Sequence, residues 1–496
     1  MKGFSLNNKN ILRPDYIPTL RGQMTEKYIT QPFFNTLGQR EIKIIVAPTG
    51  FGKTWAIWNI ISPSFLKNYG CLHIHVAPHI ETIDKKEIEL YISKSFRNQD
   101  YPLVIYNNSS IDFTHIRNSL LKGRSVILTL SDQSLMRLMN EKDSRLLQLV
   151  SDYGSETLLT RDEFSYGTTT SADNYKNDKG HSNSKYRATF INNLHALYQC
   201  GCEFYAFTAT PSREHLGELP LAFETDMRII NEWPKKEEIL LFQAWYEMLQ
   251  VTDYTEEQYN DDSILIQELK NLNEEVRQRE HRLEMILDDT PYVDPSSKFT
   301  SMLSVQTDTG SETRFTTKSV LDAVRNNSDI ISSGYTFIIA TADGWKEYDS
   351  HGQETGNSGS GSEWLSLMNS NTSSARMLVV IFKGTYGINI PSLCAGVTLR
   401  CPKAMTSDTK ETIRTSGDQY MGRFNRSNMD DRSWKIFGDL TKNYGTERGL
   451  QFLQIKNTYT FRAPDGVNSY WNDTIRDFKE RNGNSFGDMI TYLYHE

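Results

Sequence analysis

The sequence predicts an α/β protein built from two parallel-sheet units. In the first half of the chain, short apolar runs rich in β-branched residues alternate with helix-like stretches, and a second alternating region starts near Thr317. Continuous apolar runs are typical of parallel strands that helices cover on both faces. The 496 residues also give room for two to four domains at roughly 100–200 residues each.

The first unit is predicted to span residues 1–235. Its buried strands are expected at Ile42–Val46, Leu72–Ala77, Ser125–Leu130, Thr157–Leu159 and Phe204–Phe207. A helix is expected over Thr54–Ile61. The polar stretch Thr168–Arg187 contains glycine and predicts an exposed loop.

Residues 236–316 are predicted to form a helical insertion. Within Thr255–Leu287, apolar side chains recur at helical spacing at Leu265, Leu269, Leu272 and Val276, and Arg279 interrupts the stripe. This pattern favours a helix or helical hairpin packed on a neighbouring element over a free coiled-coil dimer.

The second unit is predicted to span residues 317–443, followed by a small C-terminal extension over 444–496. A helix is expected at Ser319–Arg325, and Gly352–Ser362 is expected to be a flexible loop because it is rich in glycine and serine. The extension is rich in aromatic residues, which could stack on bases or pack against the second unit. Strands are expected at Tyr335–Ala340, Met377–Phe382, Gly396–Leu399 and Trp434–Phe437.

Composition excludes several classes of protein. Lys and Arg total 54 and Asp and Glu total 62, so the net charge of −8 excludes a histone-like coat for nucleic acid but not a local basic track. No apolar run is long enough for a membrane span, and the N-terminus lacks an apolar signal core. The odd, sparse set of 5 cysteines indicates a reduced, intracellular protein whose thiols are buried rather than metal-binding.

A candidate phosphate loop follows the first strand. Ala47–Thr54 (APTGFGKT) lies between a predicted buried strand and a predicted helix, which is the context that a P-loop needs. Gly50 and Gly52 allow backbone N–H groups to turn toward phosphate oxygens, and the helix N-terminus adds its dipole. Lys53 is expected to neutralise the β- and γ-phosphates of ATP, and Thr54 to ligate Mg²⁺. The strict pattern is not met, because Ala47 stands where the first glycine belongs. Thr49 and Phe51 complete the predicted nucleotide-binding loop.

Two further segments of the first unit carry candidate chemistry. Asp162 and Glu163 follow the strand Thr157–Leu159, where a carboxylate pair suits metal-assisted hydrolysis. We assign Asp162 to the metal and Glu163 to the attacking water. Thr208 and Thr210 end the strand Phe204–Phe207, and their hydroxyls can hydrogen-bond the carboxylate segment and sense its state.

The second unit contains the octet Gln419–Arg426 (QYMGRFNR). Arg423 and Arg426 are three residues apart, so on a helix they share a face and can reach the same anion. A planar guanidinium suits the charge that builds up on a transferring γ-phosphoryl group. A basic helix on the protein surface would show the same pattern.

Taken in order, these segments resemble the motifs of superfamily 2 helicases of the DEAD/DEAH-like type. Motif I is matched by Ala47–Thr54, motif II by Asp162–Ser165, motif III by Thr208–Thr210 and motif VI by Gln419–Arg426. Two further segments, Val76–Pro78 and Leu128–Leu135, resemble strand-end motifs that would contact nucleic acid. Leu20–Gln23 looks like the upstream element whose glutamine, here Gln23, reads adenine. Lys383–Pro391 looks like motif V, with Gly387 and Asn389 as nucleotide contacts.

The resemblance implies two tandem RecA-like domains with ATP and Mg²⁺ bound by the first. Lys53, Thr54, Asp162 and Glu163 would act from that domain. Arg423 and Arg426 would reach in from the second as arginine fingers, and Gln419 is a further candidate catalytic residue there. Two residues depart from the pattern. Ser165 replaces the His or Asp that links motif II to motif III, and Asn389 replaces a common Asp.

The implied function is an ATP-dependent nucleic-acid helicase or translocase, with DNA favoured over RNA as the partner. The compact chain resembles stand-alone phage or viral helicases, which would act in the host cytoplasm. Three alternatives stay open: a duplex translocase of a restriction-like assembly that does not unwind, an RNA helicase, and a nucleotide-gated scaffold that has lost hydrolysis.

Overall fold

The structure is a computed structural model that describes most of the chain. The described residues are 22–48, 50–78, 85–106, 110–140, 144–165, 168, 186–210, 227–239, 248–252, 262–292, 298–305, 315–341, 343–361, 363–370, 373–380, 390–399, 422, 431–457 and 460–464. The chain divides into an N-terminal unit, Gln23–Pro234, and a C-terminal unit that contains Lys235–Glu496.

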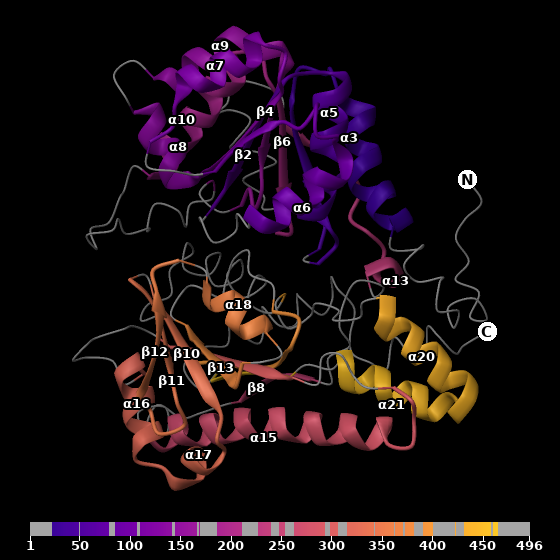
Figure 1. Cartoon of the computed structure of the whole chain (residues 1–496), viewed down its shortest axis with the longest axis vertical. Coiled ribbons are helices and arrows are strands. Elements are labelled where there is room, and N and C mark those ends of the chain that lie inside the picture. The colour runs from indigo at the N-terminus through magenta and orange to yellow at the C-terminus, as the bar shows by residue number, and fades with distance from the viewer. Residues whose placement is uncertain are drawn as a thin grey trace. The chain divides into compact units, whose positions relative to one another are not determined.

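The N-terminal unit is built on a seven-stranded sheet in which every neighbouring pair is parallel (Figure 1). The five predicted strands are confirmed as β1, β2, β4, β5 and β6, and two short edge strands, β3 and β7, were not predicted. Across the sheet the order is β3 (Leu103–Ile105), β4 (Val126–Ser131), β2 (Leu72–Ala77), β5 (Thr157–Arg161), β6 (Glu203–Thr208), β1 (Ile42–Val46) and β7 (Met227–Ile229).

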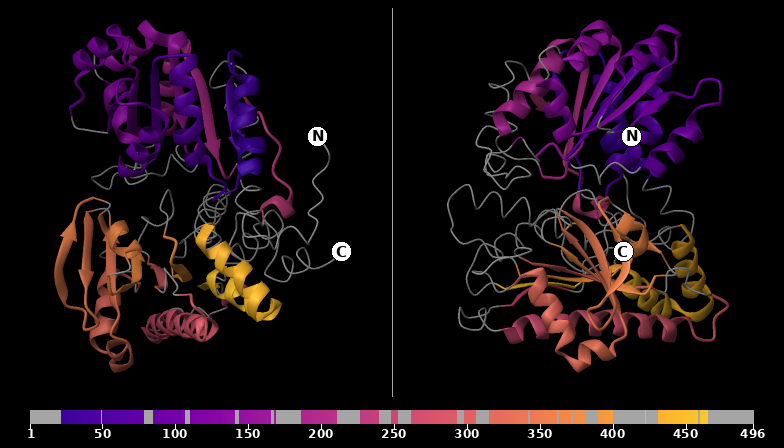
Figure 2. Two further views of the ribbon diagram at one scale, coloured as in Figure 1. Left: turned by 45° about the vertical axis from the view of Figure 1, so that its right-hand side comes forward. Right: turned by 60° about the vertical axis from the view of Figure 1, so that its left-hand side comes forward.

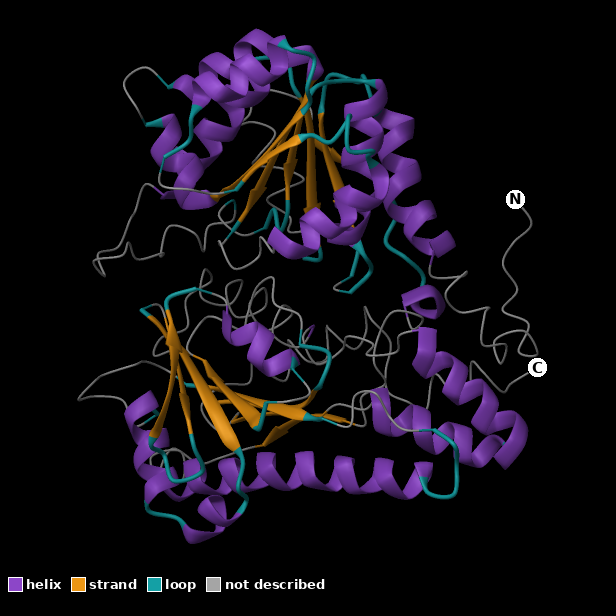
Figure 3. Ribbon diagram, viewed as in Figure 1, coloured by secondary structure: helices purple, strands orange, loops and turns teal. Residues whose placement is uncertain are grey.

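Helices cover both faces of this sheet (Figure 3). One group consists of η1 (Glu26–Thr30), α3 (Gln31–Thr36), α4 (Lys53–Ala56), η2 (Ile57–Ile61), α5 (Ser62–Asn68) and α6 (Lys85–Ser95). The other consists of α7 (Phe113–Leu121), α8 (Asp132–Met139), α9 (Arg145–Tyr153) and α10 (Tyr186–Gln199), with η4 (Gly154–Glu156) after α9. Because both faces are covered, β1, β2, β4 and β5 are buried along their whole length, as their continuous apolar runs predicted.

The strand register brings three predicted segments to one edge of the sheet. Val46 at the end of β1 pairs with Thr208 at the end of β6, and Arg161 at the end of β5 pairs with Ala206. Since the strands are parallel, the residues that follow β1, β5 and β6 leave the sheet at the same edge. This is where nucleotides bind in open α/β sheets.

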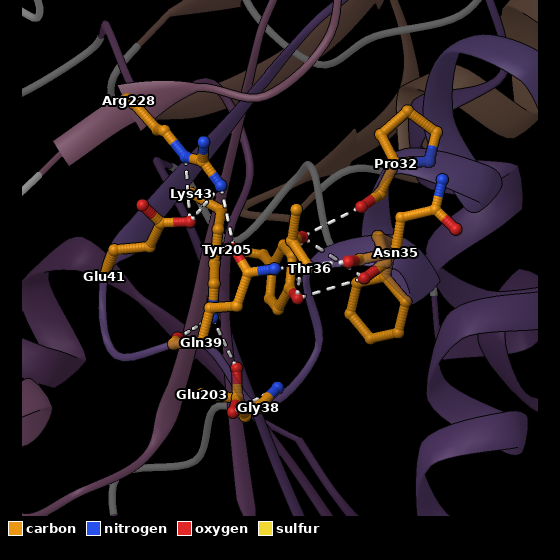
Figure 4. Close-up of polar contacts among 11 residues, drawn as sticks. Pro32, Asn35, Thr36, Gly38, Gln39, Glu41, Lys43, Glu203, Tyr205 and Arg228 are labelled. Carbon is orange, nitrogen blue, oxygen red and sulfur yellow. Dashed lines mark hydrogen bonds and ion pairs between the residues drawn. The ribbon is translucent and has the colours of Figure 1, made fainter.

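A buried ion pair lies at the opposite edge of the same strands (Figure 4). Lys43 of β1 is fully buried, and its Nζ donates to Glu203 Oε2 at 2.6 Å and to the carbonyl oxygen of Gln39. Its ammonium also lies 4.9 Å from the centre of the Tyr205 ring. Glu203 additionally accepts a hydrogen bond from the backbone N–H of Gly38. The cation in the middle of an apolar strand is therefore compensated by charge, hydrogen bonds and an aromatic face.

We expect Lys43→Met to lower the free energy of unfolding by about 3 kcal/mol, because the mostly buried carboxylate of Glu203 loses its cationic partner. Urea unfolding of the two proteins measures the difference. The double variant Lys43→Met/Glu203→Gln removes both charges and keeps the acceptor for Gly38, so it should recover part of the loss. A double variant no more stable than the single one would contradict this account of the pair.

A second buried polar network joins β2, β5 and the helix after the phosphate loop. Nε2 of His73 and Nδ1 of His75 lie 2.8 and 2.9 Å from Thr160 Oγ1, and Nδ1 of His73 lies 2.8 Å from Ser62 Oγ. The ring of Trp58 packs on both imidazoles. Burial lowers the pKa of His75 to about 3, helped by the charge of Arg161, and lowers the pKa of His73 well below its ordinary value.

Both histidines should therefore stay neutral in the folded protein below pH 6.5, where the same side chains in the unfolded chain become protonated. Between that pH and about 3 the unfolded chain binds protons that the folded chain does not, so stability should fall as pH falls. The expected slope is up to about 1.4 kcal/mol per pH unit for each histidine. Urea unfolding at pH 7.5, 6.5 and 5.5 measures it. The variant His75→Gln cannot titrate, and an undiminished slope in that variant would contradict the assignment.

The C-terminal unit contains an eight-stranded mixed sheet (Figure 2). The neighbours β10, β13, β9, β14, β15 and β8 pair in parallel, and β11 and β12 add antiparallel strands beyond β10. The strands are β8 (Met248–Thr252), β9 (Thr300–Ser304), β10 (Thr336–Thr341), β11 (Gly344–Tyr348), β12 (Glu354–Gly359), β13 (Ala375–Val380), β14 (Leu393–Thr398) and β15 (Thr460–Pro464). The predicted α/β class, with two units on mainly parallel sheets, is thus confirmed.

The boundaries inside the second half differ from those expected. Residues 236–316 supply α13 (Lys236–Ile239), two strands of the C-terminal sheet, β8 and β9, and the long helix α15 (Asp262–Leu287). This helix packs along β9, β13 and β14, which explains its apolar stripe, and Arg279 within it is buried. The segment is therefore part of the second unit rather than an insertion between two domains.

Three local predictions in the C-terminal unit are wrong. Gly352–Ser362 contains the edge strand β12, whose antiparallel pairing with β11 replaces the expected loop. Trp434–Phe437 lies in α20 (Asp431–Tyr444) rather than in a strand. The tail expected as a separate extension contributes β15 to the sheet, paired with β14 and β8.

Four further helices complete the described part of the unit: α16 (Thr317–Arg325), as predicted, α17 (Ser328–Ser332), α18 (Glu363–Asn369) and α21 (Thr446–Asn457). Among the described residues of the whole chain, no helix is both long enough and apolar enough to cross a membrane.

Candidate nucleotide-binding site

The phosphate loop has the backbone geometry that its glycines predicted. β1 ends at Val46, and a helical segment begins at Lys53 and continues through α4, η2 and α5 to Asn68. Gly50 and Gly52 have φ angles of 83° and 85°, a conformation that residues with a side chain rarely adopt. The loop therefore turns sharply between strand and helix. Thr49 lies outside the described residues.

Lys53 is directed back into this loop. Its side chain is buried, and Nζ donates to the carbonyl oxygens of Ala47 and Pro48 at 2.7 and 3.1 Å. The backbone N–H of Ala47 in turn donates to Thr208, which ties the start of the loop to the end of β6. The positive charge of Lys53 therefore lies at the turn of the loop, which is a favourable position for binding an anion such as a phosphate.

Thr54 and Asp162 converge although 108 residues separate them. Thr54 Oγ1 donates to Asp162 Oδ2 at 3.0 Å. A hydroxyl and a carboxylate oxygen at this separation fit Mg²⁺, which uses one or two protein carboxylates together with substrate phosphates and water. Among the described residues no cluster of three or more His, Cys, Asp or Glu forms a metal cage. The Thr54 hydroxyl and the Asp162 carboxylate thus suit a Mg²⁺ ion that is also bound by nucleotide phosphates.

Glu163 adopts an uncommon backbone conformation. Its φ angle is 49°, and Asp289 is the only other described non-glycine residue with a positive φ. The backbone N–H of Glu163 donates to Asp162 Oδ1 at 3.0 Å, and that of Phe164 donates to Phe207 at 2.8 Å. Left-handed backbone costs roughly 1–2 kcal/mol for a residue with a Cβ. Such strain is often found at functional sites, where the surroundings fix a side chain in a required direction.

Ser165 links the carboxylate segment to the end of β6. Its hydroxyl lies 2.8 Å from Thr210 Oγ1 and accepts from Thr208 Oγ1 at 3.2 Å, and Thr208 Oγ1 accepts from the Thr210 backbone N–H. All three side chains are buried. Ser165 therefore makes hydrogen bonds to both threonines that were predicted to couple the two segments. The carboxylate segment and the end of β6 are connected although a serine stands at this position.

We expect Ser165→Ala to disconnect the two segments while leaving ATP affinity unchanged. The loss of two buried hydrogen bonds should lower the free energy of unfolding by about 1–3 kcal/mol. If the hydroxyls report the state of the carboxylates, ATP turnover should fall while KM for ATP stays the same. Steady-state kinetics checks this, with Ser165→Thr as the variant that keeps the hydroxyl. Unchanged turnover in Ser165→Ala would remove the coupling role of Ser165.

The segment that carries Gln23 packs beside the phosphate loop. Thr25 Oγ1 contacts the carbonyl oxygen of Phe51 at 3.5 Å, and the Tyr28 and Phe51 rings lie 5.9 Å apart, edge to face. Gln23 is itself exposed. The backbone next to Gln23 is thus fixed against the loop, which is compatible with its predicted contact to adenine.

The remaining predicted site residues cannot be placed. Gly387, Asn389, Gln419, Arg423 and Arg426 all lie outside the described residues. Their assignments stay predictions from the motif resemblance.

One buried pair beside the site was not predicted. Arg161, directly before Asp162, is fully buried and donates from Nη2 to Asp132 Oδ2 at 2.9 Å. Asp132 is 1% exposed and begins α8, immediately after β4. A signal was present in the sequence, because an arginine at the end of the apolar run Thr157–Thr160 requires a buried partner.

Comparisons with known proteins give similarities to solved structures. No protein-family model and no curated protein sequence matches the chain. Dbp5 from S. cerevisiae, bound to RNA and ADP BeF3, is 12% identical with a TM-score of 0.48, covering 94% of this chain and 91% of that one.

Two further solved structures are similar to the chain. The helicase Lhr from Mycobacterium smegmatis, bound to ssDNA and AMP-PNP, is 11% identical with a TM-score of 0.44, covering 93% and 50% of the two chains. A fragment described as an HsdR subunit of a type I restriction enzyme from Vibrio vulnificus YJ016 is 13% identical with a TM-score of 0.44, covering 98% and 70%. The solved structures to which the chain is similar thus include a helicase and a fragment of a restriction-enzyme subunit.

Proposed function

We propose that this protein is an ATP hydrolase of the superfamily 2 helicase type. One observation carries the proposal: the hydroxyl of Thr54, directly after Lys53 of the phosphate loop, donates to Asp162, directly before Glu163. Two adjacent pairs, Lys53–Thr54 and Asp162–Glu163, are thereby brought from distant parts of the sequence to one edge of a parallel sheet, and each residue is of a type that ATP hydrolysis uses.

The roles follow from chemistry and position. The backbone N–H groups of the loop at Gly50–Gly52 and the ammonium of Lys53 bind the phosphates of ATP. Thr54 and Asp162 hold Mg²⁺, which neutralises charge on the phosphate oxygens. Glu163 orients and deprotonates the attacking water. Gln23 is proposed as the adenine contact, and Thr208 and Thr210 pass the state of the carboxylates to the end of β6.

The proposed partner is nucleic acid, with DNA favoured over RNA. The support is the ordered motif set in the sequence rather than any contact in the structure. Arg423 and Arg426 are proposed as arginine fingers and Gln419 as a further catalytic residue. Gly387 and Asn389 are proposed as further nucleotide contacts. We expect the protein to act inside the cell, or in the host cytoplasm if the chain has a phage or viral origin.

The test is the steady-state ATPase rate of the whole chain. It is measured alone and with single-stranded DNA, duplex DNA, forked DNA and single-stranded RNA. We expect one polymer to stimulate turnover strongly. Strand separation on forked DNA would identify a helicase, whereas triplex displacement without strand separation would identify a duplex translocase. An absence of ATP turnover with every polymer would overturn the proposal and leave the nucleotide-gated scaffold.

A further inference from the structure

The Arg161–Asp132 ion pair connects four elements at the carboxyl edge of the N-terminal sheet. Arg161 ends β5, and its Nη2 donates to Asp132 at the start of α8. Its Nη1 lies 3.4 Å from the carbonyl oxygen of Val76, near the end of β2. The guanidinium also lies 5.2 Å from the centre of the Phe190 ring in α10. One side chain thus joins the ends of β2 and β5 to the start of α8 and to α10.

The backbone of the same residue leads directly into the hydrolytic carboxylates. The N–H of Asp162 donates to the carbonyl oxygen of Val76 at 3.0 Å, the same oxygen that faces Arg161 Nη1. A shift of α8 that moves Asp132 must therefore pull on Arg161, and through it on the strained turn at Asp162 and Glu163. The ion pair and the carboxylates form one mechanically connected unit.

Stability alone does not explain why this position is charged. Both side chains are almost completely buried, with exposures of 0% and 1%, so both pay the full cost of leaving water. Replacing a buried ion pair by apolar residues of similar volume is often neutral or stabilising, whereas a directional pair specifies a unique arrangement. A planar guanidinium is suited to this, because its fork fixes two acceptors in a set geometry.

We propose that the Arg161–Asp132 pair is a positioning device that makes ATP hydrolysis at Asp162–Glu163 depend on what binds at the ends of β2 and β4. This inference rests on the proposed function and on the expectation from the motif resemblance that Val76–Pro78 and Leu128–Leu135, at those strand ends, contact nucleic acid. Arg161 acts through Asp162 and Glu163 rather than on ATP, so it is a positioning residue. Its loss should affect stimulation by the polymer more than basal turnover or the KM for ATP.

The test compares the double variant Arg161→Met/Asp132→Leu with the wild-type chain. Both charges are removed together, so neither partner is left unpaired. We expect basal turnover and KM for ATP to stay close to wild type. We expect stimulation by the active polymer to fall by about tenfold, inside the roughly 5- to 150-fold range of coupling between sites. Arg161→Lys keeps the charge but not the fork, and it should retain part of the stimulation.

The matched control is Lys43→Met/Glu203→Gln. It neutralises the buried pair at the other edge of the same sheet, so it tests whether any lost ion pair lowers stimulation. If the polymer stimulates ATP turnover of Arg161→Met/Asp132→Leu as strongly as that of the wild type, this inference is overturned while the proposed function stands. The same holds if the control loses as much stimulation as Arg161→Met/Asp132→Leu. If the double variant does not fold, undiminished stimulation in Arg161→Lys overturns it. A wild-type chain that hydrolyses ATP but responds to no polymer would overturn the proposed partner and this inference together.

Discussion

The variant Glu163→Gln is expected to bind ATP but to hydrolyse it on the order of 10²- to 10⁴-fold more slowly than the wild type. The amide has the shape of the carboxylate, but it cannot accept a proton from water. The backbone N–H of Glu163 donates to Asp162 whatever the side chain is, so the turn and the metal-facing oxygen should persist. Turnover is measured by phosphate release, and ATP affinity by equilibrium binding.

Glu203→Gln is the matched control for Glu163→Gln. It makes the same chemical change at the opposite edge of the sheet, where Glu203 pairs with Lys43 (Figure 4). It should lower stability and leave turnover unchanged. If Glu163→Gln hydrolyses ATP as fast as the wild type, Glu163 is not the base, and a different residue must activate the water.

The N-terminal unit was predictable because its local signals agree with its fold. Parallel strands buried on both faces appear as continuous apolar runs, and the glycines of the phosphate loop occur where φ is positive. The sequence assigned both Thr54 and Asp162 to the metal, but it did not predict their direct hydrogen bond, because spacing along the chain does not give strand order. The Arg161–Asp132 pair was missed because its partner comes from another strand end.

The C-terminal unit was predicted less well for physical reasons. Polar, glycine-rich β12 is a strand because it pairs with β11, and tertiary pairing of this kind overrides local propensity. The run Trp434–Phe437 is too short for periodicity to separate strand from helix. A longer window shows the helix, because the buried residues Ile436, Phe437 and Leu440 lie three, four and seven positions after the buried Ser433.

The variant Lys53→Met is expected to abolish ATP turnover and to weaken ATP binding by about 10- to 100-fold, the loss of a charged hydrogen bond of roughly 1.5–3 kcal/mol. The loss of its hydrogen bonds to two carbonyl oxygens should lower the free energy of unfolding by about 1 kcal/mol, less than the loss of an ion pair. One of these, on Pro48, still accepts from the backbone N–H of Phe51. Binding is measured by calorimetry, and stability by urea unfolding.

Lys43→Met is the opposite case in the same unit, since Lys43 also is buried but pairs with a carboxylate. It should lower stability without changing the KM for ATP or the turnover of the folded fraction. The two buried lysines are thus expected to differ in role: Lys43 pairs with Glu203 at the edge away from the phosphate loop, whereas the ammonium of Lys53 lies within that loop. If Lys53→Met destabilised the protein as much as Lys43→Met and left ATP binding intact, the loop would be a structural turn, and the nucleotide site would have to lie elsewhere.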